Sequence, residues 1–464
     1  MSETLTSVLA GALQDLRWPV ESISGESRTA VELLSIADRV AQILAEHQVQ
    51  PGEPIHVRIG NRPSDLGSLL GAWQAGAVAV PIHVTAAPAT VSALLNATGA
   101  RFLIDADRLE ICGYAPPPDR PLLREDAALV IFTSGSTGLP KGVVIGHRRL
   151  AAKLAVLERL LAFRSDDVVL VPLQLTFIFG LWVSLLALHA GARLILVPKF
   201  SPDAITKGLG GGATVLAGVP SMFRTLLADP TISMPGLRMI LTGGEVLPKP
   251  LAAGLQRTAP KAAIYDLYGL TETGSCDFVV GPDDQPDGRG TIGVPTKGVA
   301  FQIGETGELQ IKTPFGMLGY LDNPQLTAAA FDNGHFNTGD LAGLDPDGRV
   351  QLVGRSKDIV SRGGIKIAPL EIDNLLAEHP DVAAALCAGV PDERLGEIIH
   401  AVVVLRKGSQ LTPSALRDWM LARTERFKVP DAFYFTDALP AGATGKADRR
   451  GVATLFIASR EGRI

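Results

Sequence analysis

Cysteine is scarce in this sequence, which contains only Cys112, Cys276 and Cys387 among its 464 residues. Three cysteines so far apart form neither a disulfide framework nor the spacing of a metal site. Such usage fits a reducing compartment, and we expect a cytoplasmic protein. An excess of basic residues is also lacking, since the formal net charge is −5. We therefore expect no nucleic-acid partner.

A convincing membrane segment is absent as well. Residues 168–192 carry no charged side chain and are long enough to span a bilayer. However, Pro172, Gln174, Gly180 and His189 interrupt the run. We interpret it as a buried strand at Val168–Val171, a loop and a buried helix, and expect no membrane span.

Strand-like and helical patterns alternate along most of the first 270 residues. For example, a strand at Ile55–Ile59, a helix at Pro63–Gln74 and a strand at Val78–Ile82 form one βαβ unit. Such a unit implies parallel pairing through a right-handed crossover. The pattern predicts the α/β fold class, with a large layered N-terminal domain.

The pattern changes after Ile303, where short strands and Asp-Gly or Gly-Glu turns predict a β-rich subdomain. About a hundred residues then remain, enough for a small α+β domain. They read as a strand pair, a helix at Pro369–Glu378, two strands, a helix at Pro413–Arg423 and a strand. We expect a large domain of residues 1–354 and a small mobile domain of residues 355–464.

A loop rich in hydroxyls and glycines lies between two apolar runs, Ala127–Phe132 and Val143–Ile145. The pattern predicts strand, loop, strand. Glycines let backbone N–H groups approach a ligand, and Lys141 adds a positive charge, which together suit a polyphosphate. Pro140 before Lys141 departs from the Walker A motif, which argues against a P-loop NTPase. The alternative is a solvated hairpin.

Two further blocks carry groups suited to a nucleotide. Tyr268 follows the predicted strand Ala263–Leu267, and at a strand end an aromatic ring can stack on a purine. Nearby Glu272 can bind Mg²⁺ through its carboxylate, although Thr271–Glu272 also suits a helix cap. Asp340 is predicted to lie in a loop, where its carboxylate can accept two ribose hydroxyls or simply form a turn.

These blocks, with Gly445-Lys446 near the C-terminus, occur in the order found in the adenylate-forming enzymes. The sequence resembles this superfamily, which includes acyl- and aryl-CoA synthetases, nonribosomal peptide synthetase adenylation domains and firefly luciferase. The resemblance covers roughly Ala30 to Arg450 and is strongest to an acyl- or aryl-CoA ligase. It implies ATP, Mg²⁺ and the cosubstrate CoA.

The resemblance also implies roles for individual residues. The expected catalytic residues are Lys446, Glu272, Thr137 and Lys141, with Glu272 also the metal ligand. The residues expected to bind ATP or AMP are Thr133, Ser134, Gly135, Ser136, Gly138, Gly243, Gly244, Glu245, Tyr268, Gly269, Thr271, Asp340 and Arg355. Lys357 is the expected hinge, and Gly363 and Gly364 the expected loop on the CoA side.

The expected acyl pocket includes Phe177, Phe179, Gly180 and Gly218, which are equally suited to a core. Phe177 stands where many acyl-CoA synthetases carry a histidine. Amino-acid-activating relatives carry an aspartate near Ile178, and a free ammonium group would be costly against these apolar walls. We therefore expect an aromatic or aliphatic acid without an α-amino group.

The implied reaction has two steps. A carboxylate first attacks the α-phosphorus of ATP, giving acyl-AMP and pyrophosphate, and the thiol of CoA then takes the acyl group. The alternatives are a free-standing adenylation enzyme that loads a carrier-protein phosphopantetheine, and a non-catalytic nucleotide-binding relative. Retention of Lys141, Glu272, Asp340 and Lys446 argues against the last, because a decayed site loses charges that are costly to hold.

Overall fold

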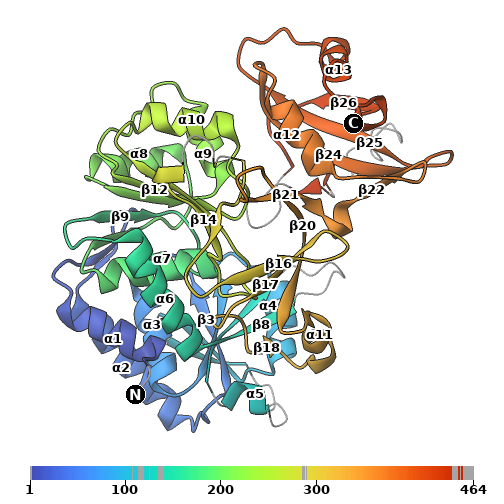
Figure 1. The fold of residues 1–464 in the computed structure, drawn as a ribbon. Helices are drawn as coiled ribbons and strands as arrows, with labels where there is room; N and C mark the ends of the chain where they lie inside the picture. Colours follow the sequence, from blue (N-terminus) through green and yellow to red (C-terminus); the bar gives the residue numbers. More distant parts are fainter. Residues whose placement is uncertain are drawn as a thin grey trace.

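A computed structural model describes residues 3–106, 108–112, 120–124, 126–133, 141–284, 288, 290–440, 448–449 and 451–452. Figure 1 shows a large body, coloured from blue to yellow along the sequence, and a smaller orange-to-red part beside it. The large body contains two mixed sheets, each with a parallel centre, and helices around them, and the small part has its own sheet. The predicted α/β class is confirmed.

The first sheet has nine strands in the order β15-β14-β13-β12-β11-β9-β10-β1-β2. The run from β13 to β1 is parallel throughout, and the three outermost pairs are antiparallel. The strands are β1 (Val20–Ser22), β2 (Ser27–Arg28), β9 (Val168–Val171), β10 (Arg193–Leu196), β11 (Val215–Gly218), β12 (Met239–Gly243), β13 (Ala263–Tyr268), β14 (Phe278–Val280) and β15 (Val294–Pro295).

The second sheet has seven strands in the order β18-β8-β7-β4-β3-β5-β6. The predicted βαβ unit is confirmed, because β3 and β4 are parallel and α3 (Pro63–Gln74) connects them. The strands are β3 (Pro54–Ile59), β4 (Val78–His83), β5 (Phe102–Asp105), β6 (Arg108–Ile111), β7 (Ala127–Thr133), β8 (Lys141–Gly146) and β18 (Gly319–Tyr320).

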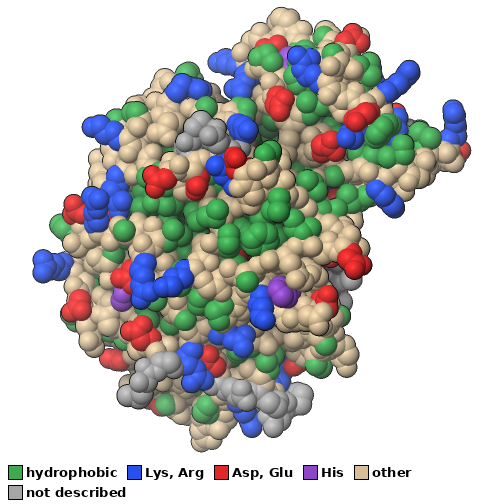
Figure 2. All heavy atoms as spheres, in the orientation of Figure 1, with side chains coloured by type: hydrophobic (Ala, Val, Ile, Leu, Met, Phe, Trp, Pro, Cys, Tyr) green, Lys and Arg blue, Asp and Glu red, His purple; other side chains and the backbone are tan. Residues whose placement is uncertain are grey.

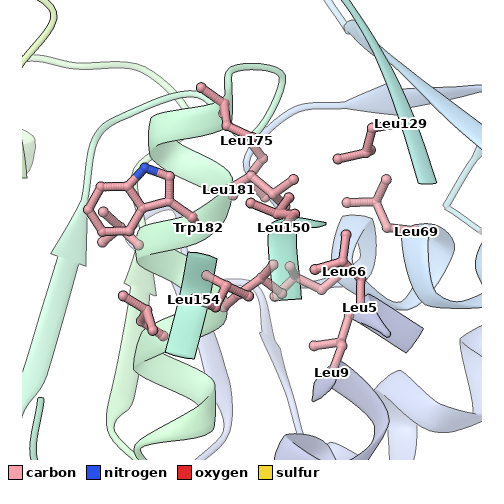
Figure 3. Close-up of a cluster of buried hydrophobic side chains, with 14 of the residues drawn as sticks. Leu5, Leu9, Leu66, Leu69, Leu129, Leu150, Leu154, Leu175, Leu181 and Trp182 are labelled. Carbon is pink, nitrogen blue, oxygen red and sulfur yellow. The ribbon is translucent and has the colours of Figure 1, made fainter. Parts of the chain in front are cut away.

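One hydrophobic core joins the two sheets. It contains side chains of α1 (Leu5–Asp15), α2 (Ala30–Glu46), α3, α6 (His147–Leu161) and α7 (Ile178–His189), together with strands of both sheets. Figure 3 shows part of it, with Leu5, Leu66, Leu150 and Trp182 converging from four different helices. Helix α7 is apolar on all sides, as expected of a helix buried between layers.

The other face of the first sheet is covered by α8 (Pro202–Gly210), α9 (Pro220–Leu227) and α10 (Lys249–Thr258), which share a second core with it. Short helices α4 (Pro88–Thr98), α5 (Pro121–Arg124) and α11 (Pro324–Ala329) lie elsewhere on the large body. Helices α1 and α6 were not among the predicted elements.

The apolar segment 168–192 divides as predicted into strand β9, a loop and helix α7. Within the described ranges, no helix combines the length and apolar character needed to cross a membrane.

The predicted β-rich subdomain is confirmed and begins at Ala300. Its strands are β16 (Ala300–Ile303), β17 (Glu308–Lys312), β19 (Phe331–Asp332), β20 (His335–Leu344) and β21 (Val350–Arg355). The prediction of a loop around Asp340 is wrong, because Asn337–Asp340 lie inside β20. The pairing of β20 with β17 shifts register here, so the turn-forming residues occupy a bulge rather than a loop.

The small part is the predicted α+β unit. Its strands are β22 (Val360–Arg362), β23 (Ile365–Ile367), β24 (Val382–Asp392), β25 (Gly396–Leu405) and β26 (Ala432–Phe435), packed with α12 (Pro369–Ala377) and α13 (Pro413–Leu421) around a separate core. In Figure 2 this part stands above a band of hydrophobic side chains that crosses the middle of the large body. Near the junction, a Cβ on Gly354 of β21 would lie only 2.9 Å from Cβ of Ala368, so a larger residue would push the two parts away from each other.

Candidate functional site

The carboxyl ends of β11, β12 and β13 lie level with one another. The register places Gly218 beside Thr242, and Gly243 beside Leu267. Tyr268 is the last residue of β13, and the segment with Glu272 follows it. Because ligands of open α/β sheets bind at this edge, the sheet brings several of the predicted site residues to one place.

Tyr268, Asp340 and Arg355 form a hydrogen-bonded cluster at this edge. The Tyr268 hydroxyl donates to Oδ2 of Asp340 at 2.6 Å, and Nε of Arg355 lies 2.7 Å from Oδ1 of the same carboxylate. Burial, followed by the neighbouring Asp340 charge, raises the pKa of Tyr268 well above its usual value, so the phenol stays a donor. Asp340 is buried, whereas the Arg355 side chain is half exposed.

The bulge in β20 sets the direction of Asp340. Gly339 has a φ of +74°, which favours glycine, and its N–H donates to Oε1 of Glu308 at 2.7 Å. The Thr338 hydroxyl donates to the Leu309 carbonyl at 2.6 Å. Cross-strand pairing of Asp340 with Arg355 of β21 then keeps the carboxylate beside the guanidinium. A bulge commonly re-aims a side chain in this way.

Glu272 lies in the segment after β13, and the one described side chain that donates a hydrogen bond to its carboxylate does so at a long distance. The Tyr320 hydroxyl donates to Oε1 of Glu272 at 3.3 Å, and the Lys141 ammonium lies 5.4 Å from the centre of the Tyr320 ring. Burial raises the pKa of Glu272, although the Tyr320 hydrogen bond and the charges of Lys141 and Arg355 oppose this. A partly buried carboxylate whose one described side-chain hydrogen bond is long fits a divalent cation.

Protein side chains alone do not complete a metal site. Among the residues that the structure describes, no group of three or more His, Cys, Asp or Glu side chains is arranged to hold a metal ion. Mg²⁺ usually takes one or two carboxylates together with substrate phosphates and water. Glu272 therefore fits a Mg²⁺ that arrives with a nucleotide rather than a resident ion.

The two strands predicted on either side of the phosphate-loop residues are confirmed. Thr133 ends β7, Lys141 begins β8, and the two residues pair across the antiparallel ladder. Ser134, Gly135, Ser136, Thr137 and Gly138 lie outside the described residues, as does Lys446. The roles expected of these six residues therefore stay predictions.

Part of the predicted acyl pocket comes together beside β12. A Cβ on Gly243 would lie 3.3 Å from the Phe179 ring, and Phe179 stacks on Trp182 with ring centres 5.2 Å apart. A Cβ on Gly180 would lie 2.4 Å from the Gln174 carbonyl oxygen, so glycine permits the tight entry into α7. These residues place apolar walls next to the strand ends.

The remaining pocket residues are arranged differently. A Cβ on Gly218 would point at the Phe223 ring of α9, on the face of the sheet opposite Phe179. Gly218 of β11 pairs with Thr242 of β12 and shares its face of the sheet. Gly243 is the next residue of β12 and therefore faces the opposite side. Phe177 precedes α7 and is 37% exposed.

The other expected nucleotide contacts surround the same edge. Gly244 has a φ of +87°, and Glu245 lies 3.4 Å from the Arg224 guanidinium. A Cβ on Gly269 would lie 2.3 Å from the Cys276 nitrogen, so only glycine fits there. Thr271 is partly exposed in the same segment as Glu272.

The expected hinge and CoA-side residues lie in the connection to the small part. Lys357 is exposed in a short 3₁₀ turn, Ser356–Asp358, directly after β21. Gly363 and Gly364 form the turn between β22 and β23, with φ values of +57° and +84°. Two positive φ values are typical of a tight hairpin turn.

The sequence analysis did not identify two residues that support the site, Lys153 and Arg449. Lys153 is completely buried on α6 beneath the segment that carries Glu272. Its sequence signal was a charged residue within the apolar stripe Leu150, Leu154 and Leu157, at helical spacing. Arg449 contacts Asp358 beside the expected hinge, and it had no comparable local signal.

Comparison with known proteins agrees with this geometry. Residues 15–321 match the AMP-binding enzyme family, and residues 371–446 match the AMP-binding enzyme C-terminal domain. A feruloyl-CoA synthase from Amycolatopsis sp is 33% identical, with 91% of this chain and 92% of that protein covered. A fatty acid–[acyl-carrier-protein] ligase from Streptomyces coeruleorubidus is 30% identical, with 94% and 93% covered.

Solved structures include the O-succinylbenzoate coenzyme A synthetase of Bacillus subtilis in complex with ATP and magnesium ion. It is 26% identical, with a TM-score of 0.81 and coverage of 96% of this chain and 99% of that chain. The fold, the order of the motifs and these similarities agree, and the chain is therefore a member of the AMP-binding enzyme family.

Proposed function

We propose that this protein is an acid–thiol ligase that joins a carboxylic acid without an α-amino group to AMP and then to the thiol of CoA. The observation that carries the proposal is the convergence of Tyr268, Asp340 and Arg355 at the carboxyl edge of the first sheet. These groups come from three strands and form one cluster suited to a nucleoside. The CoA synthase and ligase names of similar proteins support the second step.

In the first step, the cluster would orient the nucleotide. Asp340 can accept ribose hydroxyls in exchange for its present partners, and half-exposed Arg355 can turn toward the same sugar. Lys141 and the loop before it would hold the pyrophosphate leaving group, and Lys446 would bring the acid carboxylate to the α-phosphorus. Positioning and charge neutralisation of this kind provide most of the catalysis of phosphoryl transfer.

Glu272 would hold Mg²⁺ together with the phosphates of ATP. The cation, when bound, neutralises charge that develops on the leaving pyrophosphate. Tyr320 would keep the Glu272 carboxylate in place by its hydrogen bond at 3.3 Å.

In the second step, the small domain would present a different face to the acyl adenylate. We propose that residues 1–354 and 355–464 are the two domains and that Lys357 is the pivot between them. A hinge requires only a few residues that absorb a change in φ and ψ, and exposed Lys357 meets this requirement. The Gly363–Gly364 turn would then approach the pantetheine arm.

The walls beside β12 favour an apolar acid. Phe179 and Trp182 stack on one another, and buried Ile178 begins α7 where amino-acid-activating relatives carry an aspartate. An α-ammonium group would lose hydration here without gaining a carboxylate partner. We propose an aromatic or aliphatic acid. The three described thiols are unpaired, which supports a cytoplasmic setting.

A carrier-protein phosphopantetheine is the alternative acceptor. One similar protein is a fatty acid–[acyl-carrier-protein] ligase, and the first step is the same for both acceptors. The acceptor would be decided by the surface around the Gly363–Gly364 turn rather than by the nucleotide site.

A pyrophosphate-release screen tests the proposal. The purified protein with MgATP is offered benzoates, cinnamates, fatty acids and amino acids, and we expect release only with acids that lack an α-amino group. Each active acid is then supplied with free CoA or with a holo carrier protein, and thioester is measured. No ATP–pyrophosphate exchange with any acid would contradict the adenylation step.

A further inference from the structure

The segment between β13 and β14 is held in an unusual backbone conformation. Gly274, Ser275 and Cys276 have consecutive φ values of +87°, +67° and +51°. A non-glycine residue in this region is strained and persists only where its surroundings hold it. Because Glu272 lies just before this turn and Tyr268 at the start of the segment, what holds the turn also places the nucleotide site.

The turn is held by the Thr296 hydroxyl, which donates to the Cys276 carbonyl at 3.0 Å, and by Lys153 of α6. Its ammonium donates to the Cys276 carbonyl at 2.6 Å and to the Thr296 hydroxyl at 3.2 Å. It also lies 5.1 Å from the centre of the Phe315 ring. Lysine is almost never fully buried unless it is paired, and Lys153 has 0% exposure. The hydrogen bonds to Cys276 and Thr296 therefore offset the free energy that the Lys153 ammonium loses when it leaves water.

Asp277 is the carboxylate that faces Lys153, with Oδ1 3.8 Å from the ammonium. Its Oδ2 accepts a hydrogen bond from the Thr273 hydroxyl, and its N–H donates to the Tyr268 carbonyl at 2.6 Å. Oδ1 has no hydrogen bond among the described residues. Burial raises the pKa of Asp277 to about 6. Both side chains of this pair are completely buried.

Lys153 also links two parts of the site along the chain. Helix α6 directly follows β8, which begins at Lys141. On the acyl side, the indole N–H of Trp182 donates to the Ser275 hydroxyl at 3.3 Å, and Figure 3 shows Trp182 beside the leucines of α6. The turn 274–276 is therefore attached through Lys153 to α6, the helix that follows β8. It is also attached through Trp182 to the proposed wall of the acyl pocket.

We propose that Lys153 is a positioning residue of the nucleotide site. Its ammonium holds the 274–276 turn so that Glu272 and Tyr268 stay where MgATP needs them, without touching the nucleotide. The inference rests on the proposed function and adds to it a residue that no motif contains. A purely structural role would instead make Lys153 matter only for stability.

A double variant separates the two roles. Lys153→Met alone leaves the Asp277 charge buried without a partner, which is destabilising. Lys153→Met with Asp277→Asn removes both charges, so the melting temperature should return close to that of the wild type. The Lys153 hydrogen bond to the Cys276 carbonyl stays absent and, among the described groups, only the Thr296 hydroxyl still donates to that carbonyl, so the Kd for MgATP, measured by calorimetry, should rise about tenfold or more.

The matched control is a partly buried ion pair of the second sheet. Arg101, just before β5, contacts Glu53, just before β3, through two hydrogen bonds of 2.7 and 2.9 Å. Arg101→Met with Glu53→Gln should leave the Kd for MgATP unchanged. The KM for the acid should also be unchanged in this control variant.

A folded Lys153→Met, Asp277→Asn variant with the wild-type Kd would overturn the inference. If that variant does not fold, Thr296→Val replaces it, because it removes an acceptor of Lys153 and the Thr296 hydrogen bond to the Cys276 carbonyl without changing charge. It should raise the Kd about two- to threefold, and an unchanged Kd would overturn the inference. Binding of MgATP by the wild type without pyrophosphate exchange would refute the proposed function alone.

Discussion

Two arginine–aspartate clusters flank Lys357, one on each side of the proposed pivot. On the large-domain side, Arg355 contacts Asp340, and the hydroxyl of neighbouring Ser356 donates to the Gly339 carbonyl at 3.2 Å. On the small-domain side, Arg449 contacts Asp373 at 2.5 Å and Asp358 at 3.7 Å. Only Ser356 and Lys357 lie between the two attachments, which confines any rotation to a very short segment.

The clusters differ in exposure and in hydrogen bonding. The Arg355 side chain is 50% exposed, whereas that of Arg449 is 21% exposed. Arg449 also donates to the Cys387 carbonyl at 2.6 Å, and Cys387 donates its N–H to Asp373 at 2.6 Å. In the large-domain cluster, Asp340 and Arg355 can therefore release one another and bind a ligand. The small-domain cluster stabilises the fold through Arg449 and Asp373 and has no such role. This difference predicts separate effects on catalysis and on stability.

The largest effect is expected from Lys446, the one proposed catalytic residue that the small domain contributes. Lys446→Ala should reduce adenylate formation about 10²–10³-fold, because it removes a charge that acts on the transition state. Thioester formation from supplied acyl-AMP should be largely spared. Equal loss of both steps, measured separately, would contradict the assigned role.

Asp340→Asn should show that the large-domain cluster serves the ligand. The variant weakens charge-assisted hydrogen bonds worth about 1.5–3 kcal/mol, so the KM for ATP should rise about ten- to hundredfold. Its melting temperature should change little by comparison. Asp345→Asn, on the connection after the same strand, is the control and should keep the wild-type KM.

Lys357→Pro should test whether rotation occurs between the clusters. Proline fixes φ, so one half-reaction should slow selectively, as measured by single-turnover kinetics. Lys357→Ala should leave both half-reactions within about twofold, because the exposed side chain is not required. A proline variant with both steps unchanged would reject the pivot.

Arg449→Met should affect stability rather than nucleotide binding. Loss of the guanidinium leaves the Asp373 carboxylate and the Cys387 carbonyl without their partner, which should cost about 1–3 kcal/mol in free energy of unfolding. Arg394→Met, with an exposed side chain in the same domain, should cost much less. If Arg449→Met instead raised the KM for ATP as Asp340→Asn does, the two clusters would not differ in role.

The smallest effect concerns pH. Burial raises the pKa of Asp373 above its usual value, although Arg449 opposes this, so the folded state binds the proton more tightly than the unfolded state. The contribution of this group to stability therefore increases as pH falls through the folded pKa. The difference in free energy of unfolding between wild type and Asp373→Asn should shift in favour of the wild type as the pH is lowered from 7 toward about 4, the usual pKa of an aspartate, as measured by urea unfolding.

Patterns within short stretches predicted the layers of the large domain and the existence of the small one. The parallel strands are buried on both faces and read as continuous apolar runs, and turn-forming residues mark their carboxyl ends. The phosphate hairpin and the place of Tyr268 at the end of β13 followed from the same patterns. The motif residues then indicated the family before any contact was known.

Long-range register decided what those patterns could not. Asp340 lies in a bulged strand because β20 pairs with both β17 and β21, and turn-forming residues read locally as a loop. Gly218 and Gly243 face opposite sides of their sheet because of the alternation in each strand.

What the sequence by itself determined is therefore the kind of layers, their order and the chemical groups at the strand ends. The tertiary structure alone decided which of these groups meet and what supports them. Lys153 beneath the 274–276 turn and Arg449 beside Asp358 are examples, since each contacts residues more than eighty positions away. Periodicity reports which face of an element is buried, but not which distant charge it is buried against.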